Sequence, residues 1–211
     1  MWDGFDLPGA VRHELRGFGD TPMPPAGSFS NADDLEAALG DEPAALVGAS
    51  FGGLVCLELA GRRPDRVSEL VLLGAPLPDH DWSEEMIDFE RREEELFEQG
   101  ELHAAAALNA DFWLEDPAHR ERVIEMQERA FQLQSESEAE AEEASIDLRA
   151  VRARTLVAVG SLDKPDFHRI AERLASEIPN ARHAVIEGAG HLPAIERQAD
   201  TARLVRQFLH I

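Results

Sequence analysis

A serine flanked by glycines, at an expected turn from a strand into a helix, constrains this chain more than any other feature. The apolar residues 44–47 have the length of a strand, and Gly48-Ala49-Ser50-Phe51-Gly52-Gly53 follows them. From Leu54 onward, apolar residues recur at helical spacing. Glycines two positions before and after Ser50 indicate a turn so crowded that side chains there would collide, with Ser50 held in a strained conformation. This pattern is typical of a nucleophile elbow, which presents a serine hydroxyl above a strand end, at the positive end of the next helix.

Two more polar residues follow expected strands further along the chain. Residues 155–160 predict a buried strand that leads into Ser161-Leu162-Asp163. Residues 184–187 predict another, followed by Gly188-Ala189-Gly190-His191. A single aspartate after a strand is usually a turn or cap residue, and a single histidine usually has no chemical role. An elbow serine, an acid and a histidine in this order instead predict a nucleophile, an orienting acid and a general base.

The chain resembles proteins of the α/β-hydrolase fold, of the esterase, lactonase and C–C hydrolase kind. The matching segments are residues 15–22, the elbow, residues 63–73, 159–163 and 188–193, and Glu196-Arg197. The resemblance implies an α/β fold with a mostly parallel sheet and helices on both faces. It also implies a helical cap inserted between the sixth and seventh strands of the full fold. The core would comprise residues 1–77 and 149–211, and the cap residues 78–148.

The predicted cap is rich in glutamate, alanine and arginine and carries few strand signals. We expect helices over residues 84–99, 102–114 and 117–133, the last with Pro117 at its first position. Residues 135–146 form an acidic stretch, which predicts a shorter helix or a mobile linker.

The beginning of the chain departs from the family pattern. Residues 10–15 predict a strand, which by resemblance is the fourth of the full fold. The first three strands would then be missing, together with the His-Gly loop that supplies one backbone N–H of the oxyanion hole. Trp2-Asp3-Gly4-Phe5 resembles the short helix that would follow this loop. Two explanations stay open: a sequence truncated relative to the natural protein, which we favour, or a reduced variant whose sheet closes differently.

The resemblance assigns roles to particular residues. Ser50 corresponds to the nucleophile, His191 to the general base and Asp163 to the acid that orients it, with the backbone N–H of Phe51 as one oxyanion donor. Asp166 is the rival acid, and we prefer Asp163 because it directly follows the expected strand and matches the family position. A serine at the elbow excludes relatives that use aspartate there, such as haloalkane dehalogenases and epoxide hydrolases.

The composition of the chain limits the kinds of partner, metal and cofactor that we expect it to bind. The net charge of −22 at pH 7 argues against binding nucleic acid or an anionic membrane surface. The single cysteine, Cys56, rules out an internal disulfide and agrees with a reducing compartment, so we expect a cytoplasmic protein. No histidine has a second His or Cys ligand close by, and no G-x-G-x-x-G segment opens a helix, so we expect no metal and no cofactor. Whether two copies of the chain form a homodimer stays open.

The sequence therefore predicts a cofactor-independent serine hydrolase of small carboxylic esters or lactones, acting through an acyl-enzyme. The first alternative is a C–C bond hydrolase of a diketone-type substrate, which would need an arginine or other polar groups to hold a substrate carboxylate. The second is a non-catalytic member of the fold, either a pseudo-enzyme or a ligand-binding protein, and the missing oxyanion loop motivates it.

Overall fold

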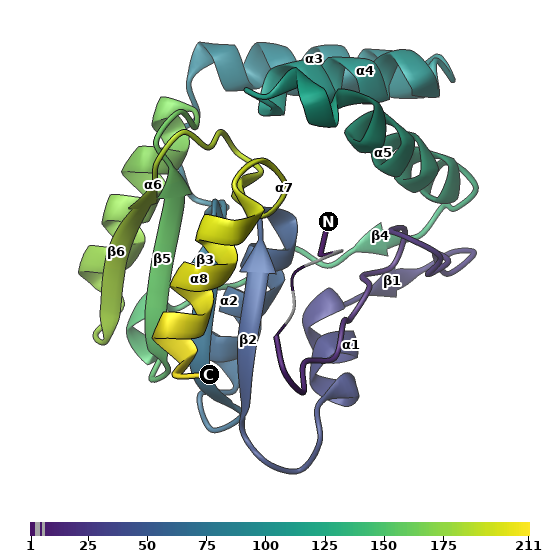
Figure 1. The fold of residues 1–211 in the computed structure, drawn as a ribbon. Coiled ribbons are helices and arrows are strands. Elements are labelled where there is room, and N and C mark those ends of the chain that lie inside the picture. The colour runs from purple at the N-terminus through teal and green to yellow at the C-terminus, as the bar shows by residue number, and fades with distance from the viewer. Residues whose placement is uncertain (3–4, 6) are drawn as a thin grey trace. The chain divides into compact units, whose positions relative to one another are not determined.

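The chain forms two compact units in a computed structural model that describes residues 1–2, 5 and 7–211 (Figure 1). Met1–His13, Ala32–His80 and Glu143–Ile211 make up the first, here called the sheet unit. Glu14–Asn31 and Asp81–Glu142 make up the second, here called the helical unit. The division into a core and a cap domain at residues 78–148 stays a prediction.

A four-stranded parallel sheet organises the sheet unit. Its strands are β2 (Ala44–Ala49), β3 (Val67–Leu73), β5 (Arg154–Gly160) and β6 (Ala181–Ile186), and they pair in the order β2-β3-β5-β6. The central strands β3 and β5 are apolar and buried from Leu70 and from Leu156 onward, as strands covered on both faces must be. All carboxyl ends of these strands lie at one edge of the sheet because the pairing is parallel.

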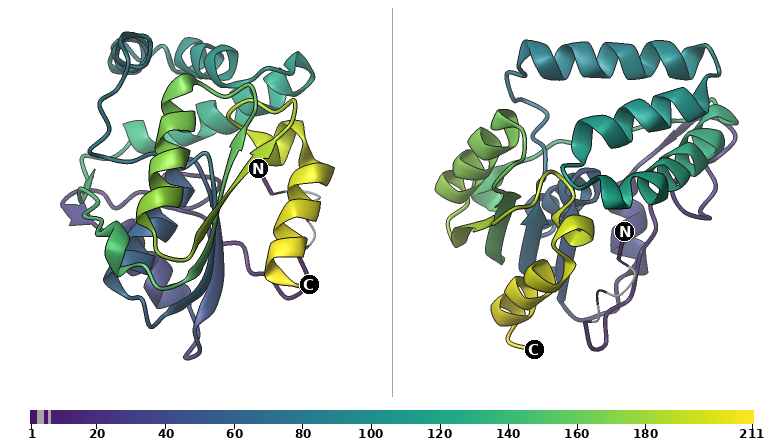
Figure 2. Two further views of the ribbon diagram at one scale, coloured as in Figure 1. Left: turned by 90° about the vertical axis from the view of Figure 1, so that its left-hand side faces the viewer. Right: turned by 45° about the horizontal axis from the view of Figure 1, so that its top comes forward.

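Helices cover both faces of this sheet, as predicted. On one face, α8 (Gln198–Leu209) packs through Phe208 against a cluster that includes Leu73 of β3. Side chains alternate along a strand, so Leu72 points to the other face. There α2 (Phe51–Arg62) packs on β2 and β3, and α6 (Pro165–Glu177) packs on β5 and β6 (Figure 2).

Shorter elements complete the sheet unit. Helix α1 (Asn31–Ala38) lies beside α2, to which Asp33 is joined by a 2.6 Å ion pair with Arg62. A 3₁₀ turn, η2 (Leu148–Ala150), precedes β5, and the single-turn helix α7 (Pro193–Glu196) follows the predicted histidine.

The helical unit contains α3 (Glu84–Glu98), α4 (Leu102–Trp113) and α5 (Arg120–Ser135). The first two confirm the predicted helices. The third begins with a 3₁₀ turn, η1 (Pro117–His119), which Asp116 caps by accepting a 2.9 Å hydrogen bond from the backbone N–H of Ala118. Aromatic rings join α3 to α4: the rings of Phe89 and Phe112 stack with centroids 4.0 Å apart.

Beyond Ser135, where α5 ends, the acidic stretch up to residue 146 is not helical. Instead β4 (Glu140–Ala141) pairs in parallel with β1 (Ser28–Phe29). The backbone N–H of Glu140 donates to the carbonyl oxygen of Gly27 at 2.9 Å, and that of Glu142 to Phe29 at 2.8 Å. Of the two predicted alternatives, a shorter helix or a mobile linker, the helix was wrong, because these N–H groups find carbonyl partners on a segment more than a hundred residues away in the chain.

The predicted strand over residues 10–15 is also absent. None of these residues has strand structure, and Val11 is 91% exposed. A strand is stabilised by ladder hydrogen bonds to a neighbouring strand, and residues 10–15 pair with none of the described strands. Residues 10–14 are also exposed. The short helix expected at Trp2-Asp3-Gly4-Phe5 lies outside the described residues. Among the described helices, none combines the length and the apolar character that crossing a membrane requires.

Candidate active site

Ser50 occupies a strained turn between β2 and α2. Its backbone has φ 47° and ψ −124°, in the left-handed half of conformational space that residues other than glycine rarely adopt. The Ser50 N–H donates to the carbonyl oxygen of Leu73 at 2.8 Å. Its own carbonyl oxygen accepts from Gly53 at 2.8 Å and from Leu54 at 3.1 Å. These bonds tie the turn to β3 on one side and to α2 on the other, and so hold the strained residue in place.

The glycines around Ser50 are not equally crowded. A Cβ atom at Gly48 would overlap the carbonyl oxygen of Gly52, and one at Gly53 would lie 2.8 Å from the Cβ of Ala75. At Gly52 a Cβ would have no neighbouring atom within 4 Å. The predicted collision is therefore correct at Gly48 and wrong at Gly52. The second crowded glycine is Gly53, where α2 approaches the loop that follows β3.

His191 and Asp163 meet Ser50 at the carboxyl edge of the sheet. The Nε2 atom of His191 lies 2.9 Å from the Oγ atom of Ser50, and its Nδ1 atom lies 3.1 Å from each carboxylate oxygen of Asp163. Asp163 is buried, and His191 is only 3% exposed. The three predicted residues, which follow three different strands, thus form one hydrogen-bonded row within the sheet unit.

The loops that carry Asp163 and His191 are fastened to each other. The N–H of Ser161 donates to the carbonyl oxygen of Ile186 at 3.0 Å, and that of Leu162 donates to Ala189 at 2.9 Å. In return, the N–H of Gly188 donates to the hydroxyl of Ser161 at 2.8 Å. Because these bonds are short-range and directional, they fix the acid and the imidazole relative to each other.

The imidazole is also enclosed by packing. The ring of Phe167, in the first turn of α6, lies 4.2 Å from the imidazole, centroid to centroid. On another side, Gly74 has φ 58°, and a Cβ there would lie 3.2 Å from the Cε1 atom of His191. A glycine is needed at residue 74 for both its positive φ and this close approach. The local sequence pattern did not indicate this role of Gly74, although a glycine directly after a strand was a visible signal.

Asp166, the rival acid, forms hydrogen bonds with other residues. Its Oδ1 atom lies 3.1 Å from the Nε2 atom of His80 and accepts a 2.8 Å hydrogen bond from Arg169. Both Asp166 and His80 are largely buried. Asp163 is therefore the acid that contacts His191, and Asp166 joins α6 to the loop that follows β3. Nothing in the sequence pattern indicated the pairing with His80, because the two residues are 86 positions apart.

Phe51 and Cys56 lie on the helix that follows Ser50. Phe51 is the first residue of α2, where backbone N–H groups point out of the helix end and the helix dipole is positive. The buried thiol of Cys56 has its pKa raised to about 12 by desolvation, so it stays protonated at neutral pH. Cys56 is thus a packing residue rather than a nucleophile.

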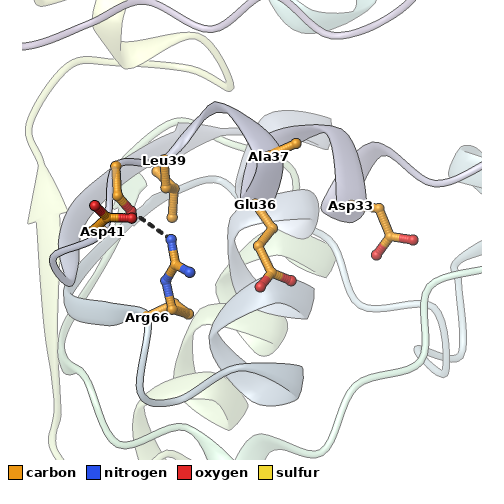
Figure 3. A pocket seen from close by; sticks show the side chains of 7 residues that line it. Asp33, Glu36, Ala37, Leu39, Asp41 and Arg66 are labelled. Carbon is orange, nitrogen blue, oxygen red and sulfur yellow. Dashed lines mark hydrogen bonds between the residues drawn. The ribbon is translucent and has the colours of Figure 1, made fainter.

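A cavity of about 420 Å³ lies at the opposite edge of the sheet (Figure 3). It is lined by Asp33, Glu36, Ala37, Leu39, Gly40, Asp41 and Arg66. The guanidinium of Arg66 donates to the carbonyl oxygen of Gly40 at 2.6 Å. These residues precede β2 and β3, so the cavity lies at the amino ends of the strands and contains none of the three residues of the hydrogen-bonded row.

An elbow serine after one parallel strand, with an acid and a histidine after two others, is the arrangement found in the α/β-hydrolase fold. Comparisons with known proteins agree. A model described as "Alpha/beta hydrolase family" matches residues 3–204. The chain is 30% identical over 223 residues to 2-hydroxymuconate semialdehyde hydrolase of Pseudomonas putida, covering 94% of this chain and 76% of that protein. It is 28% identical over 213 residues to pimeloyl-[acyl-carrier protein] methyl ester esterase of Neisseria meningitidis, covering 93% and 80%.

Solved structures show the same fold. A thermophilic esterase from Thermogutta terrifontis superimposes with a TM-score of 0.70 at 26% identity, over 93% of this chain and 78% of the esterase. The chain belongs to the alpha/beta hydrolase family, and it is a hydrolase. The fold predicted from the sequence is thereby confirmed.

Proposed function

We propose that this protein is a serine hydrolase of small carboxylic esters or lactones, with Ser50, His191 and Asp163 as its catalytic triad. The observation that carries the proposal is the row of hydrogen-bonding distances from Asp163 through His191 to the strained elbow serine. These distances support the three proposed roles, because each side chain already lies within hydrogen-bonding distance of its partner.

The geometry supports nucleophilic catalysis through an acyl-enzyme. Asp163 accepts the Nδ1–H of His191, which leaves Nε2 free of a proton and facing the Ser50 hydroxyl 2.9 Å away. As the Oγ atom attacks the substrate carbonyl carbon, its proton passes to Nε2. The imidazolium then protonates the departing alkoxide, and the C–O bond of the ester breaks. Water, activated by the same imidazole, hydrolyses the acyl-serine and restores Ser50.

The negative charge that develops on the carbonyl oxygen needs hydrogen-bond donors. We assign one to the backbone N–H of Phe51, because it follows the nucleophile directly and lies at the positive end of α2. Losing one such donor costs about 2.7–4 kcal/mol of transition-state stabilisation in other serine hydrolases.

Hydrolysis of a C–C bond is the second candidate, and one comparison favours it. The relative from Pseudomonas putida, 30% identical over 94% of this chain, is a 2-hydroxymuconate semialdehyde hydrolase. The same serine, histidine and aspartate would serve. The two candidates separate by substrate: a C–C hydrolase would cleave a diketone-type compound far faster than a simple ester.

The cellular location and the kind of substrate stay proposals as well. The single cysteine supports a reducing, cytoplasmic compartment. The net charge of −22 supports small-molecule substrates over nucleic acid.

A fluorophosphonate probe, used beside hydrolysis of p-nitrophenyl acetate and butyrate, tests the proposed function. Wild-type protein should be labelled and should release p-nitrophenol, and Ser50→Ala should do neither. Ser176→Ala is the matched control, because its hydroxyl donates to the carbonyl oxygen of Arg173 within α6, away from the three proposed catalytic residues. A folded wild-type protein that reacts with no acyl or phosphonyl probe would instead be a non-catalytic member of the family.

A further inference from the structure

Glu196 is a buried carboxylate, close to the proposed site in sequence, to which the mechanism assigns no role. It is 5% exposed and lies at the end of α7, five residues after His191. Burying a carboxylate is unfavourable unless it is hydrogen-bonded. Its Oε2 atom accepts a 2.8 Å hydrogen bond from the backbone N–H of Gly190. This N–H belongs to the residue directly before His191, so the contact bears on where the imidazole stands.

The backbone between Gly190 and Glu196 forms a closed turn. The N–H groups of Ile195 and Glu196 both donate to the carbonyl oxygen of Leu192, at 2.9 and 3.0 Å. The Glu196 side chain then reaches back to Gly190. The hydrogen bond from Gly190 to the Glu196 side chain therefore closes a loop of residues 190–196 that contains His191. The helical turn from Leu192 to Glu196 fixes the second half of this loop.

On its other side, Gly190 is pressed against the end of β5. A Cβ atom at Gly160 would overlap the carbonyl oxygens of Gly190 and Ala189, so the two backbones are in close contact there. The peptide group that joins Ala189 to Gly190, one residue before His191, is thus confined between Gly160 and the carboxylate of Glu196. Without that carboxylate, the hydrogen bond that holds the peptide on this side would be lost.

We propose that Glu196 is a positioning residue for His191, acting through the N–H of Gly190 to keep Nε2 within hydrogen-bonding distance of Ser50. The inference rests on the proposed serine hydrolase function. Displacement of a catalytic group by about 1 Å can lower turnover by about 100-fold. The distance between Nε2 and the hydroxyl is 2.9 Å, so a shift of that size would break the bond.

Two substitutions by side chains of similar length distinguish the effect of the hydrogen bond from the effect of side-chain volume. Glu196→Gln keeps an oxygen acceptor for the Gly190 N–H, and Glu196→Met fills the same space without one. Glu196→Met should lower kcat on p-nitrophenyl butyrate by about 100-fold, while KM should change by less than about threefold. Glu196→Gln should restore kcat to within about fivefold of wild type. If Glu196→Met melts below the assay temperature, Glu196→Ala replaces it.

Thr201→Val is the control for local destabilisation. Thr201 is fully buried in α8, and its hydroxyl lies 2.8 Å from the carbonyl oxygens of Pro193 and Arg197, to which it donates. The substitution removes a buried hydrogen bond from the same segment without touching Gly190. It should lower the melting temperature and leave kcat within about threefold of wild type. Equal losses of kcat in Thr201→Val and Glu196→Met, or in Glu196→Gln and Glu196→Met, would overturn the positioning role.

A proton NMR measurement separates this inference from the proposed function. The Nδ1–H of His191, bonded to Asp163, should give a low-field imidazole resonance that disappears in His191→Gln. That resonance should persist in Glu196→Gln and Thr201→Val and should shift or broaden in Glu196→Met. An unchanged resonance in Glu196→Met overturns the positioning role, whether or not the protein hydrolyses esters. Absence of turnover in wild-type protein overturns the proposed function alone, and the resonance still decides the role of Glu196.

Discussion

Replacing Gly48 by alanine should destabilise the elbow, whereas the same replacement at Gly52 should not. A Cβ at Gly48 would overlap the carbonyl oxygen of Gly52 and would lie 2.7 Å from the Cα of Gly53. Both are backbone atoms, so no side-chain rotation can relieve the clash. The end of β2 would have to move away from the first turn of α2. Overpacking of this kind costs about 1–3 kcal/mol.

Gly52 is the matched control because it lies four residues away in the same turn. A Cβ there would have no atom within 4 Å, and Gly52 is not among the glycines with positive φ. Replacing such a glycine by alanine stabilises a protein by about 0.4–1 kcal/mol, because the unfolded chain loses freedom. A change of 1 kcal/mol shifts the melting temperature of a chain of this size by roughly 2–4 °C. Gly48→Ala should therefore melt about 2–12 °C lower than wild type, and Gly52→Ala about 1–4 °C higher.

Far-ultraviolet circular dichroism, recorded on wild type and both variants in one buffer, measures these shifts. Hydrolysis of p-nitrophenyl butyrate, followed in parallel, reports whether Ser50 stays in place. Gly48→Ala should lose activity as well as stability, because the displaced turn carries the nucleophile. A wild-type melting temperature in Gly48→Ala, or an equal decrease in both variants, would refute the steric account, since only one of the two positions is crowded.

Three further predictions concern single side chains. His191→Ala should fold like wild type and lose turnover by several orders of magnitude, because the residual acceleration without the base is only about 10³–10⁴-fold over water; unchanged turnover, measured with p-nitrophenyl butyrate, would remove His191 from the mechanism. Asp163→Asn should lower kcat by about 10⁴-fold through the wrong imidazole tautomer, whereas Asp166→Asn should lower the melting temperature and keep kcat within about tenfold. The reverse order of kcat values would reassign the acid. Burial raises the pKa of the Cys56 thiol from 9.0 to about 12, so the stability that its protonated form provides is present below about pH 9 and is lost as the pH rises toward 12. Iodoacetamide at about pH 8 should therefore modify Cys56 only after unfolding in urea, as mass spectrometry would show, and rapid alkylation of the folded protein would contradict its burial.

Local patterns predicted most of the sheet unit. Strands β3 and β5 were visible because a strand covered on both faces needs apolar side chains at nearly every position. Residues 10–15 were also predicted as a strand and form none, because strand pairing depends on a neighbouring segment that the local pattern does not specify. For the same reason β4 was not predicted as a strand, because its partner β1 lies more than a hundred residues away in the chain.

The sequence alone determined the fold class, and it indicated Ser50, His191 and two rival acids, Asp163 and Asp166, as candidate site residues. An elbow, an acid and a histidine each follow a strand, and a parallel sheet brings all strand ends to one edge. Only the tertiary structure decided that Asp163 rather than Asp166 meets His191, and that Gly48 is crowded while Gly52 is not. Those outcomes depend on distances between atoms far apart in the chain, which are set when helices and loops pack on the sheet.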